Sequence, residues 1–128
     1  MDEYGLIGFP LSHSFSKKYF TEKFLQTNNT HCIYNNFEIA HISLLTNMLQ
    51  NNHLKGLNVT IPYKQQVLPY LDFKSPVVET IQACNCIKIL NNKLYGYNTD
   101  VIGFEASFKE KYNPLIHRKA LILGTGGA

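Results

Sequence analysis

Short apolar runs alternate along the chain with stretches whose apolar residues recur at helical spacing. Because strands that alternate with helices build parallel sheets covered on both faces, the pattern predicts a three-layer α/β sandwich with a mostly parallel sheet. Two runs around Asn91-Asn92 predict one antiparallel hairpin in that sheet. The predicted strands are residues 4–9, 31–38, 55–59, 85–90, 93–97 and 119–123. The predicted helices are a stretch that follows Ser16 and ends near residue 26, then residues 42–49, 62–71 and 98–112, with a further turn opened by Ser75-Pro76.

The junction Gly56–Lys64 is the most informative of the strand-to-helix transitions, since an apolar run ends there in Asn and Thr. Pro62 is expected near the first helical position, where its missing N–H costs nothing. Lys64 then lies in the first turn, at the positive end of the helix dipole. Because that position disfavours an ammonium ion, we expect Lys64 to exchange a proton near neutral pH.

Composition and charge narrow the classes of function. The 128 residues are 45% hydrophobic, which predicts one compact domain with a real core. The formal net charge is +3, but the basic residues are scattered and include a single arginine, Arg118. This pattern argues against a nucleic-acid surface and is compatible with a small anionic ligand.

Cysteines and histidines suggest neither a disulfide framework nor a metal centre. Cys32, Cys84 and Cys86 lack zinc spacing and are interpreted as reduced thiols of a cytoplasmic protein. The five histidines are dispersed along the sequence and predict no metal site. The acidic start Met1-Asp2-Glu3 lacks the basic residues of a signal peptide, and no apolar run approaches the roughly 18 residues of a membrane span.

Polar residues gather at three junctions where predicted strands lead into helices. The carboxyl ends of parallel strands line one crevice, so we expect these clusters to meet there, with Asn85 at the same edge. Hydroxyls beside helix-start N–H groups suit a carboxylate, and a lysine near an aspartate forms a proton-transfer pair. The clusters are Ser14 with Ser16, then Asn58, Thr60 and Lys64, then Asn98, Thr99 and Asp100.

Each of these residues, taken alone, also has a structural interpretation. The serines, Thr60 and Asp100 are candidate helix caps. Lys64 alone resembles a solvated surface lysine, and Asn85 alone a partner for strand-edge backbone groups. What favours function is that three polar clusters occur at the same kind of junction.

Four motifs carry a resemblance to a known family. Residues 8–16 (GFPLSHSFS) resemble the G-x-P-[LI]-x-H-S-x-S opening of the shikimate dehydrogenases. Residues 58–64 (NVTIPYK) match that family's N-V-T-x-P-x-K motif, and residues 98–103 (NTDVIG) match N-T-D-x-x-G. Residues 124–128 (GTGGA) are similar to its phosphate-binding turn. The motifs span nearly the whole chain in the family's order.

The resemblance implies a shikimate-binding catalytic domain over residues 1–117, followed over residues 118–128 by the first strand and Gly-rich turn of an NADP-binding domain. It implies reversible, NADPH-dependent reduction of 3-dehydroshikimate to shikimate, a step toward aromatic amino acids. The implied cofactor contacts are Gly124, Gly126, Gly127 and Ala128.

The resemblance also implies roles for the polar clusters. Ser14 and Ser16 would hold the substrate carboxylate. Lys64, paired with Asp100, would be the acid/base that moves the hydroxyl proton while the cofactor carries the hydride. The ring hydroxyls would be bound by Asn58, Thr60, Asn85 and Asp100.

Because the sequence stops at the Gly-rich turn, we expect the first part of a larger protein, without dehydrogenase activity of its own. Residues 119–123 are then an edge strand that is disordered, folds back or pairs with a second copy as a homodimer. Two rival interpretations stay open. One is a quinate/shikimate dehydrogenase of broader specificity that uses NAD, and the other is a non-catalytic shikimate- or quinate-sensing module.

Overall fold

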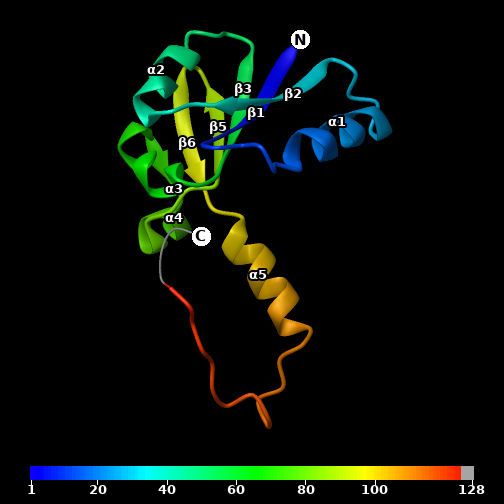
Figure 1. Cartoon of the computed structure of the whole chain (residues 1–128), viewed down its shortest axis with the longest axis vertical. Helices are drawn as coiled ribbons and strands as arrows, with labels where there is room; N and C mark the ends of the chain where they lie inside the picture. The colour runs from blue at the N-terminus through cyan, green and yellow to red at the C-terminus, as the bar shows by residue number, and fades with distance from the viewer. Residues whose placement is uncertain (125–128) are drawn as a thin grey trace.

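One six-stranded mixed sheet, in the order β2-β1-β3-β5-β6-β4, organises the computed structural model, which describes residues 1–124 (Figure 1). β1 is parallel to β2 and β3, β4 is parallel to β6, and β5 is antiparallel to both of its neighbours. The predicted mostly parallel sheet with one hairpin is therefore confirmed. The strands are β1 (Asp2–Gly8), β2 (Cys32–Glu38), β3 (Leu54–Val59), β4 (Phe73–Lys74), β5 (Cys86–Leu90) and β6 (Lys93–Tyr97).

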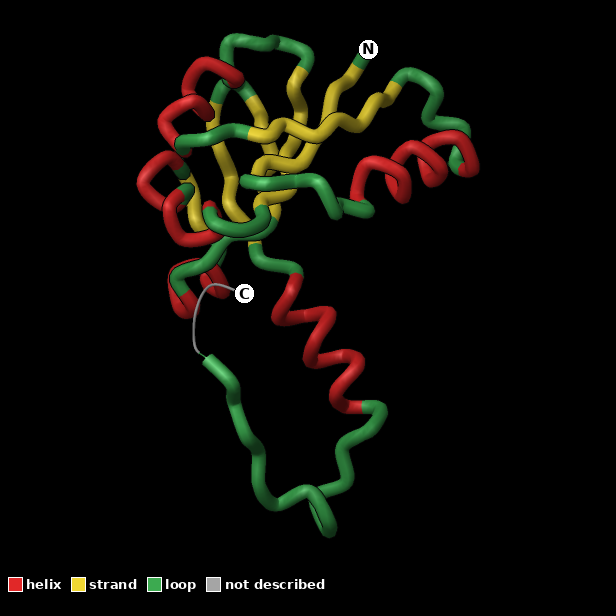
Figure 2. Tube along the Cα trace, viewed as in Figure 1, coloured by secondary structure: helices red, strands yellow, loops and turns green. Residues whose placement is uncertain are grey.

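Helices cover the sheet unequally, with α1 set apart from α2, α3 and α4 (Figure 2). The α-helices of residues 1–124 are α1 (Ser16–Gln26), α2 (Leu45–Met48), α3 (Tyr63–Gln66), α4 (Pro76–Ile81) and α5 (Asp100–Lys109). Two 3-10 turns, η1 (Ile42–Leu44) and η2 (Leu68–Tyr70), extend α2 and α3. Within the described residues, no helix has the length and apolarity that crossing a membrane requires.

Two apolar cores lie on opposite faces of the sheet, because successive side chains of a strand point to opposite sides. Leu6 of β1 packs with Leu11 and Tyr34, against Phe20 and Phe24 of α1. The next residue, Ile7, belongs to the larger core on the other face, which α2, α3 and α4 help to close. The faces are thus covered by different helices, as a three-layer sandwich requires.

Turn and cap chemistry explains several element boundaries. Asn91 and Asn92 adopt φ values of 51° and 58°, the left-handed pair that a tight two-residue hairpin turn needs. Ser75 Oγ accepts a hydrogen bond from the Val78 N–H at 3.4 Å and caps α4, with Pro76 at the first helical position. Both features were predicted from the sequence and are confirmed.

The predicted helix over residues 62–71 is shorter in the structure, and this prediction was wrong in its extent. Pro62 lies one position before α3, which ends at Gln66, and a 3-10 turn follows. Pro69 explains the break, because it has no N–H to donate to the carbonyl four residues earlier. The predicted helix over residues 42–49 likewise divides into η1 and α2, and α5 covers only residues 100–109 of the predicted 98–112.

The strand predicted over residues 119–123 does not form. These residues have no regular secondary structure and all are exposed. Strand structure requires hydrogen bonds to a neighbouring strand, and within residues 1–124 the sheet pairs only β1 to β6. The segment thus has no partner strand among the described residues, and its place in a second domain stays a prediction.

Candidate active site

One edge of the sheet collects the polar clusters that follow its strands. β1, β3 and β6 run in the same direction, so their carboxyl ends lie at one edge. β5 runs in the opposite direction and therefore begins at this edge, which brings Asn85 beside the residues that follow β3 and β6. The Asn85 carbonyl accepts from the Val59 N–H at 2.8 Å, and its N–H donates to the Tyr97 carbonyl at 3.1 Å.

Lys64 and Asp100 form a direct ion pair across this edge. Lys64 Nζ donates to Asp100 Oδ2 at 2.7 Å, although the two residues come from α3 and α5. The Lys64 side chain is only 17% exposed, whereas that of Asp100 is 51% exposed. The Lys64 carbonyl also accepts from the Cys84 N–H at 2.8 Å, which fixes α3 against the segment before β5. The pair is thus anchored on the lysine side and open to solvent on the carboxylate side.

The structural interpretations of this pair do not fit the geometry. Asp100 is not the cap of α5, because the Val101 N–H donates to Asn98 Oδ1 at 3.2 Å. The Lys64 side chain is mostly buried and contacts the Asp100 carboxylate, whereas a solvated surface lysine is exposed. A full helix dipole equals about half an elementary charge at its end, and the four-residue α3 carries less. The α3 dipole and the Asp100 carboxylate therefore act in opposite directions on the Lys64 ammonium.

Ser14, Ser16 and Thr60 line a cleft of about 510 Å³ between the β1–α1 loop and the start of the β3–α3 connection. Ser14 Oγ accepts from the Ser16 N–H at 3.3 Å, which leaves its hydroxyl hydrogen available to another acceptor. The candidate cap role of Thr60 is not observed, since α3 has no side-chain cap. With Ser12, this cleft is lined by four hydroxyl-bearing residues that follow two different strands.

Close backbone approach holds the two walls of this cleft together. The Thr60 N–H donates to the Ile7 carbonyl and the Phe9 N–H donates to the Ile61 carbonyl, both at 3.0 Å. An added Cβ at Gly8 would lie 2.5 Å from Thr60 Cγ2 and 2.6 Å from Leu11 Cδ2. Glycine is therefore required at this position for the two motifs to meet.

Asn58 faces the α1 side of the sheet and lines an adjoining apolar hollow of about 230 Å³ with Tyr34 and Cys86. The Tyr34 hydroxyl donates to Asn58 Oδ1 at 2.8 Å, and the Tyr34 ring stacks on Phe20 with centroids 4.6 Å apart. Burial raises the pKa of Tyr34 to about 12, an increase that a hydrogen bond with the Ser16 side chain partly opposes. Tyr34 thus holds the Asn58 amide in place in the hollow.

Asn85 binds the residue that precedes the catalytic candidate Asp100. Its Nδ2 donates to Thr99 Oγ1 and its Oδ1 accepts from the Thr99 N–H, each at 2.8 Å. Asn85 is 9% exposed, so its amide orientation is fixed. One N–H and one lone pair of the amide remain for another partner.

The predicted site residues therefore fall into three groups. Lys64 contacts Asp100, with Asn85 beside them, while the serines and Thr60 share the cleft and Asn58 lines the hollow. Gly124 is exposed with a φ of 91°, and the other predicted cofactor contacts, Gly126, Gly127 and Ala128, lie outside the described residues. Tyr34 was missed, because a tyrosine inside a strand gives no sequence signal that separates site from core.

Comparisons with known proteins show the family of the chain. Residues 6–87 match the family described as the shikimate dehydrogenase substrate binding domain. The chain is 38% identical to the NADP(+) shikimate dehydrogenase of Staphylococcus haemolyticus, over 98% of the chain and 47% of that protein. It is 42% identical to the Clostridium beijerinckii enzyme, over 100% of the chain and 48% of that protein. The chain thus spans about half the length of the curated relatives it matches.

Solved structures give the same result. Shikimate dehydrogenase 1 from Peptoclostridium difficile has a TM-score of 0.79 and 42% identity, covering 87% of this chain and 43% of that one. Shikimate 5-dehydrogenase from Thermus thermophilus, in complex with shikimate, has a TM-score of 0.84 and 29% identity over 99% of this chain and 49% of that one. A further structure of the Thermus enzyme, with NADP(H) and shikimate, has a TM-score of 0.76 and 26% identity, covering 87% and 42%.

Proposed function

This chain belongs to the family of shikimate dehydrogenase substrate-binding domains, and we propose that it binds shikimate and 3-dehydroshikimate for NADP-linked interconversion in a full-length protein. The observation that carries the proposal is the 2.7 Å contact between Lys64 Nζ and Asp100 Oδ2, with Lys64 four residues after Thr60, which lines the hydroxyl-bearing cleft. A proton-transfer pair next to a site for a polar ring acid is what this reaction needs.

Lys64 is the proposed acid/base. When 3-dehydroshikimate is reduced, its carbonyl carbon gains a hydride and its oxygen gains a proton, which the Lys64 ammonium donates. In the reverse direction the neutral amine takes the hydroxyl proton as the hydride leaves. Asp100 accepts a hydrogen bond from Lys64 and so orients the amine toward the reacting oxygen.

The hydride itself belongs to NADP(H), which supplies that chemistry when it is bound. Gly124, Gly126, Gly127 and Ala128 remain the predicted cofactor contacts, and of these only Gly124 lies among the described residues. The roles proposed for residues 1–124 are accordingly substrate binding and proton transfer.

The cleft suits the carboxylate and ring of the substrate. Its volume of about 510 Å³ falls within the usual range for small-ligand sites. The hydroxyls of Ser14 and Ser16 donate to the carboxylate, and Thr60 lies on the facing wall for a ring hydroxyl. Charge-assisted hydrogen bonds of this kind are about twice as strong as neutral ones.

The two asparagines are proposed to contact the remaining ring hydroxyls. Since Tyr34 occupies Asn58 Oδ1, the Asn58 amide N–H groups are left to donate. Asn85 keeps one donor and one acceptor site beyond its two bonds to Thr99. Both amides are therefore held in one orientation before substrate arrives, which lowers the entropic cost of binding.

Calorimetric titration of shikimate into the chain tests the carboxylate assignment. We expect saturable binding that weakens at least tenfold when Ser14 and Ser16 are both replaced by alanine. Ser107→Ala is the matched control, because Ser107 Oγ bonds only the Phe104 carbonyl on the exposed α5. Absence of binding to the native chain, or binding that the double variant leaves unchanged, contradicts the proposal. Quinate in the same titration distinguishes the broader-specificity alternative.

A further inference from the structure

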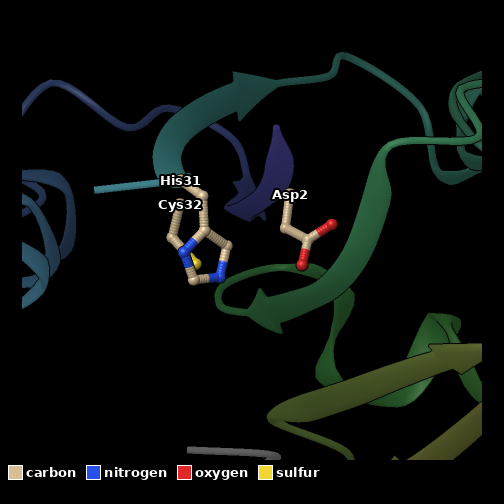
Figure 3. Close-up of side chains that lie close together, drawn as sticks. All are labelled: Asp2, His31 and Cys32. Atoms are coloured by element: carbon tan, nitrogen blue, oxygen red, sulfur yellow. The ribbon is translucent and has the colours of Figure 1, made fainter. Parts of the chain in front are cut away.

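Three metal-ligating side chains of different types gather at the amino ends of β1 and β2. Asp2, His31 and Cys32 each offer one ligand atom, and these atoms lie within 4.8 Å of one another (Figure 3). The sequence predicted no metal site, because the histidines are dispersed and Asp2 is remote from His31 along the chain. Only the pairing of β1 with β2 brings them together.

Backbone pairing holds the three residues in place. Asp2 and Cys32 are direct partners in the parallel register of β1 and β2. The Asp2 N–H donates to the His31 carbonyl at 2.9 Å, and the Cys32 N–H donates to the Asn29 carbonyl at 3.0 Å. Ligands carried on paired strands are positioned more accurately than ligands on free loops.

The three side chains are also free to bind. Among the described residues, no side-chain hydrogen bond or ion pair involves Asp2, His31 or Cys32. By contrast, the His117 ring accepts from the Asn113 N–H at 2.9 Å, and the Glu38 carboxylate accepts from the Leu11 N–H at 2.8 Å. Asp2 and Cys32 are half-buried and His31 is exposed, so an ion can reach all three.

We propose that Asp2, His31 and Cys32 bind a thiophilic divalent cation, with Zn²⁺ as the preferred ion and one coordination position open to solvent. Zn²⁺ takes carboxylate oxygen, imidazole nitrogen and thiolate sulfur at roughly 2.0–2.3 Å, which places tetrahedral ligands about 3.4–3.8 Å apart. Side-chain movements of about 1 Å close the present spacing to that value. Ca²⁺ and Mg²⁺ are disfavoured, because both prefer oxygen ligands.

The proposed metal site is separate from the candidate active site. At about 3.3 Å per residue, the seven-residue β1 carries the chain about 20 Å from Asp2 to Gly8, where the cleft begins. β2 is an edge strand of the sheet, paired only with β1. A metal ion shared by Asp2, His31 and Cys32 would therefore link the start of β2 to the start of β1. Because the ion would bind the folded chain, it would also raise the free energy of unfolding.

Titration with Co²⁺, followed by absorption spectroscopy on tag-free protein, tests the site. Co²⁺ occupies zinc sites and reports a bound thiolate through a ligand-to-metal charge-transfer band. We expect one Co²⁺ per chain, displacement by Zn²⁺, loss of the charge-transfer band in Cys32→Ser, and at least tenfold weaker binding in His31→Ala. Zn²⁺ should raise the thermal unfolding midpoint of the native chain and leave that of Cys32→Ser unchanged.

Two matched variants are the controls for non-specific metal binding. His53→Ala removes another exposed histidine and Cys86→Ser another half-buried thiol, and both should keep the native spectrum. A native chain that shows no charge-transfer band overturns the proposal, as does a band that survives Cys32→Ser. Because the readout is spectroscopic and independent of shikimate, failure here leaves the proposed function untouched, and the reverse also holds.

Discussion

At the scale of single residues, the function of Lys64 depends on a partner that lies 36 positions away in the sequence. Neither residue is unusual by itself, and it is their contact across α3 and α5 that makes a proton-transfer pair. The sequence singled out both residues through their motifs, and the structure brings them into contact. The sequence also placed Lys64 at the start of a helix, and in the structure that helix, α3, has only four residues.

Replacement of Lys64 by alanine in the full-length protein should lower kcat by about 10²- to 10⁴-fold, the usual contribution of a positioned acid/base. KM for shikimate should change much less, since the carboxylate contacts remain. Lys109→Ala is the matched control, because Lys109 also forms an ion pair, to Glu105 at 2.6 Å, but on the exposed face of α5. Steady-state NADP-linked assays measure both variants. Retained turnover in Lys64→Ala would remove this residue as the acid/base.

Tyr34 is the clearest case of a residue whose role is visible only in three dimensions. Tyr34→Phe keeps the ring stacked on Phe20 but removes the hydroxyl that fixes Asn58. We expect shikimate affinity to fall several-fold and the free energy of unfolding to fall by about 1 kcal/mol, the typical value of one buried hydrogen bond. Tyr19→Phe, on the exposed part of α1, should change neither quantity. Unaltered affinity in Tyr34→Phe would show that Asn58 needs no such support.

The raised pKa of Tyr34 predicts how the free energy of unfolding changes with pH. Unfolded tyrosine loses its proton near pH 10, whereas folded Tyr34 keeps it until about pH 12. Between these values the folded state binds more protons, so the free energy of unfolding falls as pH rises. Urea unfolding at pH 9 to 12 should show a steeper decline for the native chain than for Tyr34→Phe. Parallel curves would contradict the assignment.

At the scale of helices and strands, the sequence predicted the boundaries that local turn residues set, but not the elements that depend on long-range packing. Asn91-Asn92 predicted the hairpin turn and Ser75-Pro76 predicted the start of α4, because each pair determines the backbone conformation of only a few neighbouring residues. The two-residue β4 left no pattern in the sequence, since it forms only by pairing with β6. Conversely, the strand predicted over residues 119–123 does not form, because this apolar run has no neighbouring strand among the described residues.

The meeting of β1 with the β3–α3 connection depends on Gly8. In Gly8→Ala the new methyl group would collide with Thr60 Cγ2 and Leu11 Cδ2, so we expect a loss of about 1–3 kcal/mol in stability and weaker shikimate binding. Gly103→Ala on α5 is the matched control, because no atom lies within 4 Å of its added Cβ. Alanine there should stabilise the helix by up to about 1 kcal/mol. Urea denaturation separates the two, and equal effects would refute the packing argument.

At the scale of the whole molecule, packing divides the chain into two parts. Residues 1–98 contain every buried side chain among the described residues, whereas all residues from Thr99 to Gly124 are exposed, including apolar ones of α5 such as Phe104. Figure 1 shows α5 and the segment after it extending away from the sheet. The family match over residues 6–87 falls inside the packed part. The proposed substrate contacts therefore lie mainly in the packed part, with Asp100 at the point where the exposed part begins.

This division predicts which ligand stabilises the chain of 128 residues. Shikimate at 100 times its Kd should raise the free energy of unfolding by about 2.7 kcal/mol, because its proposed contacts lie in or next to the packed part. NADP⁺ should give no shift, since its predicted contacts are confined to the turn at residues 124–128. Thermal unfolding with each ligand measures this, and the variant lacking both Ser14 and Ser16 hydroxyls should lose the shikimate response. Stabilisation by NADP⁺ alone would mean that residues 1–128 already hold a nucleotide site, and the assignment of binding and redox functions to different parts would fail.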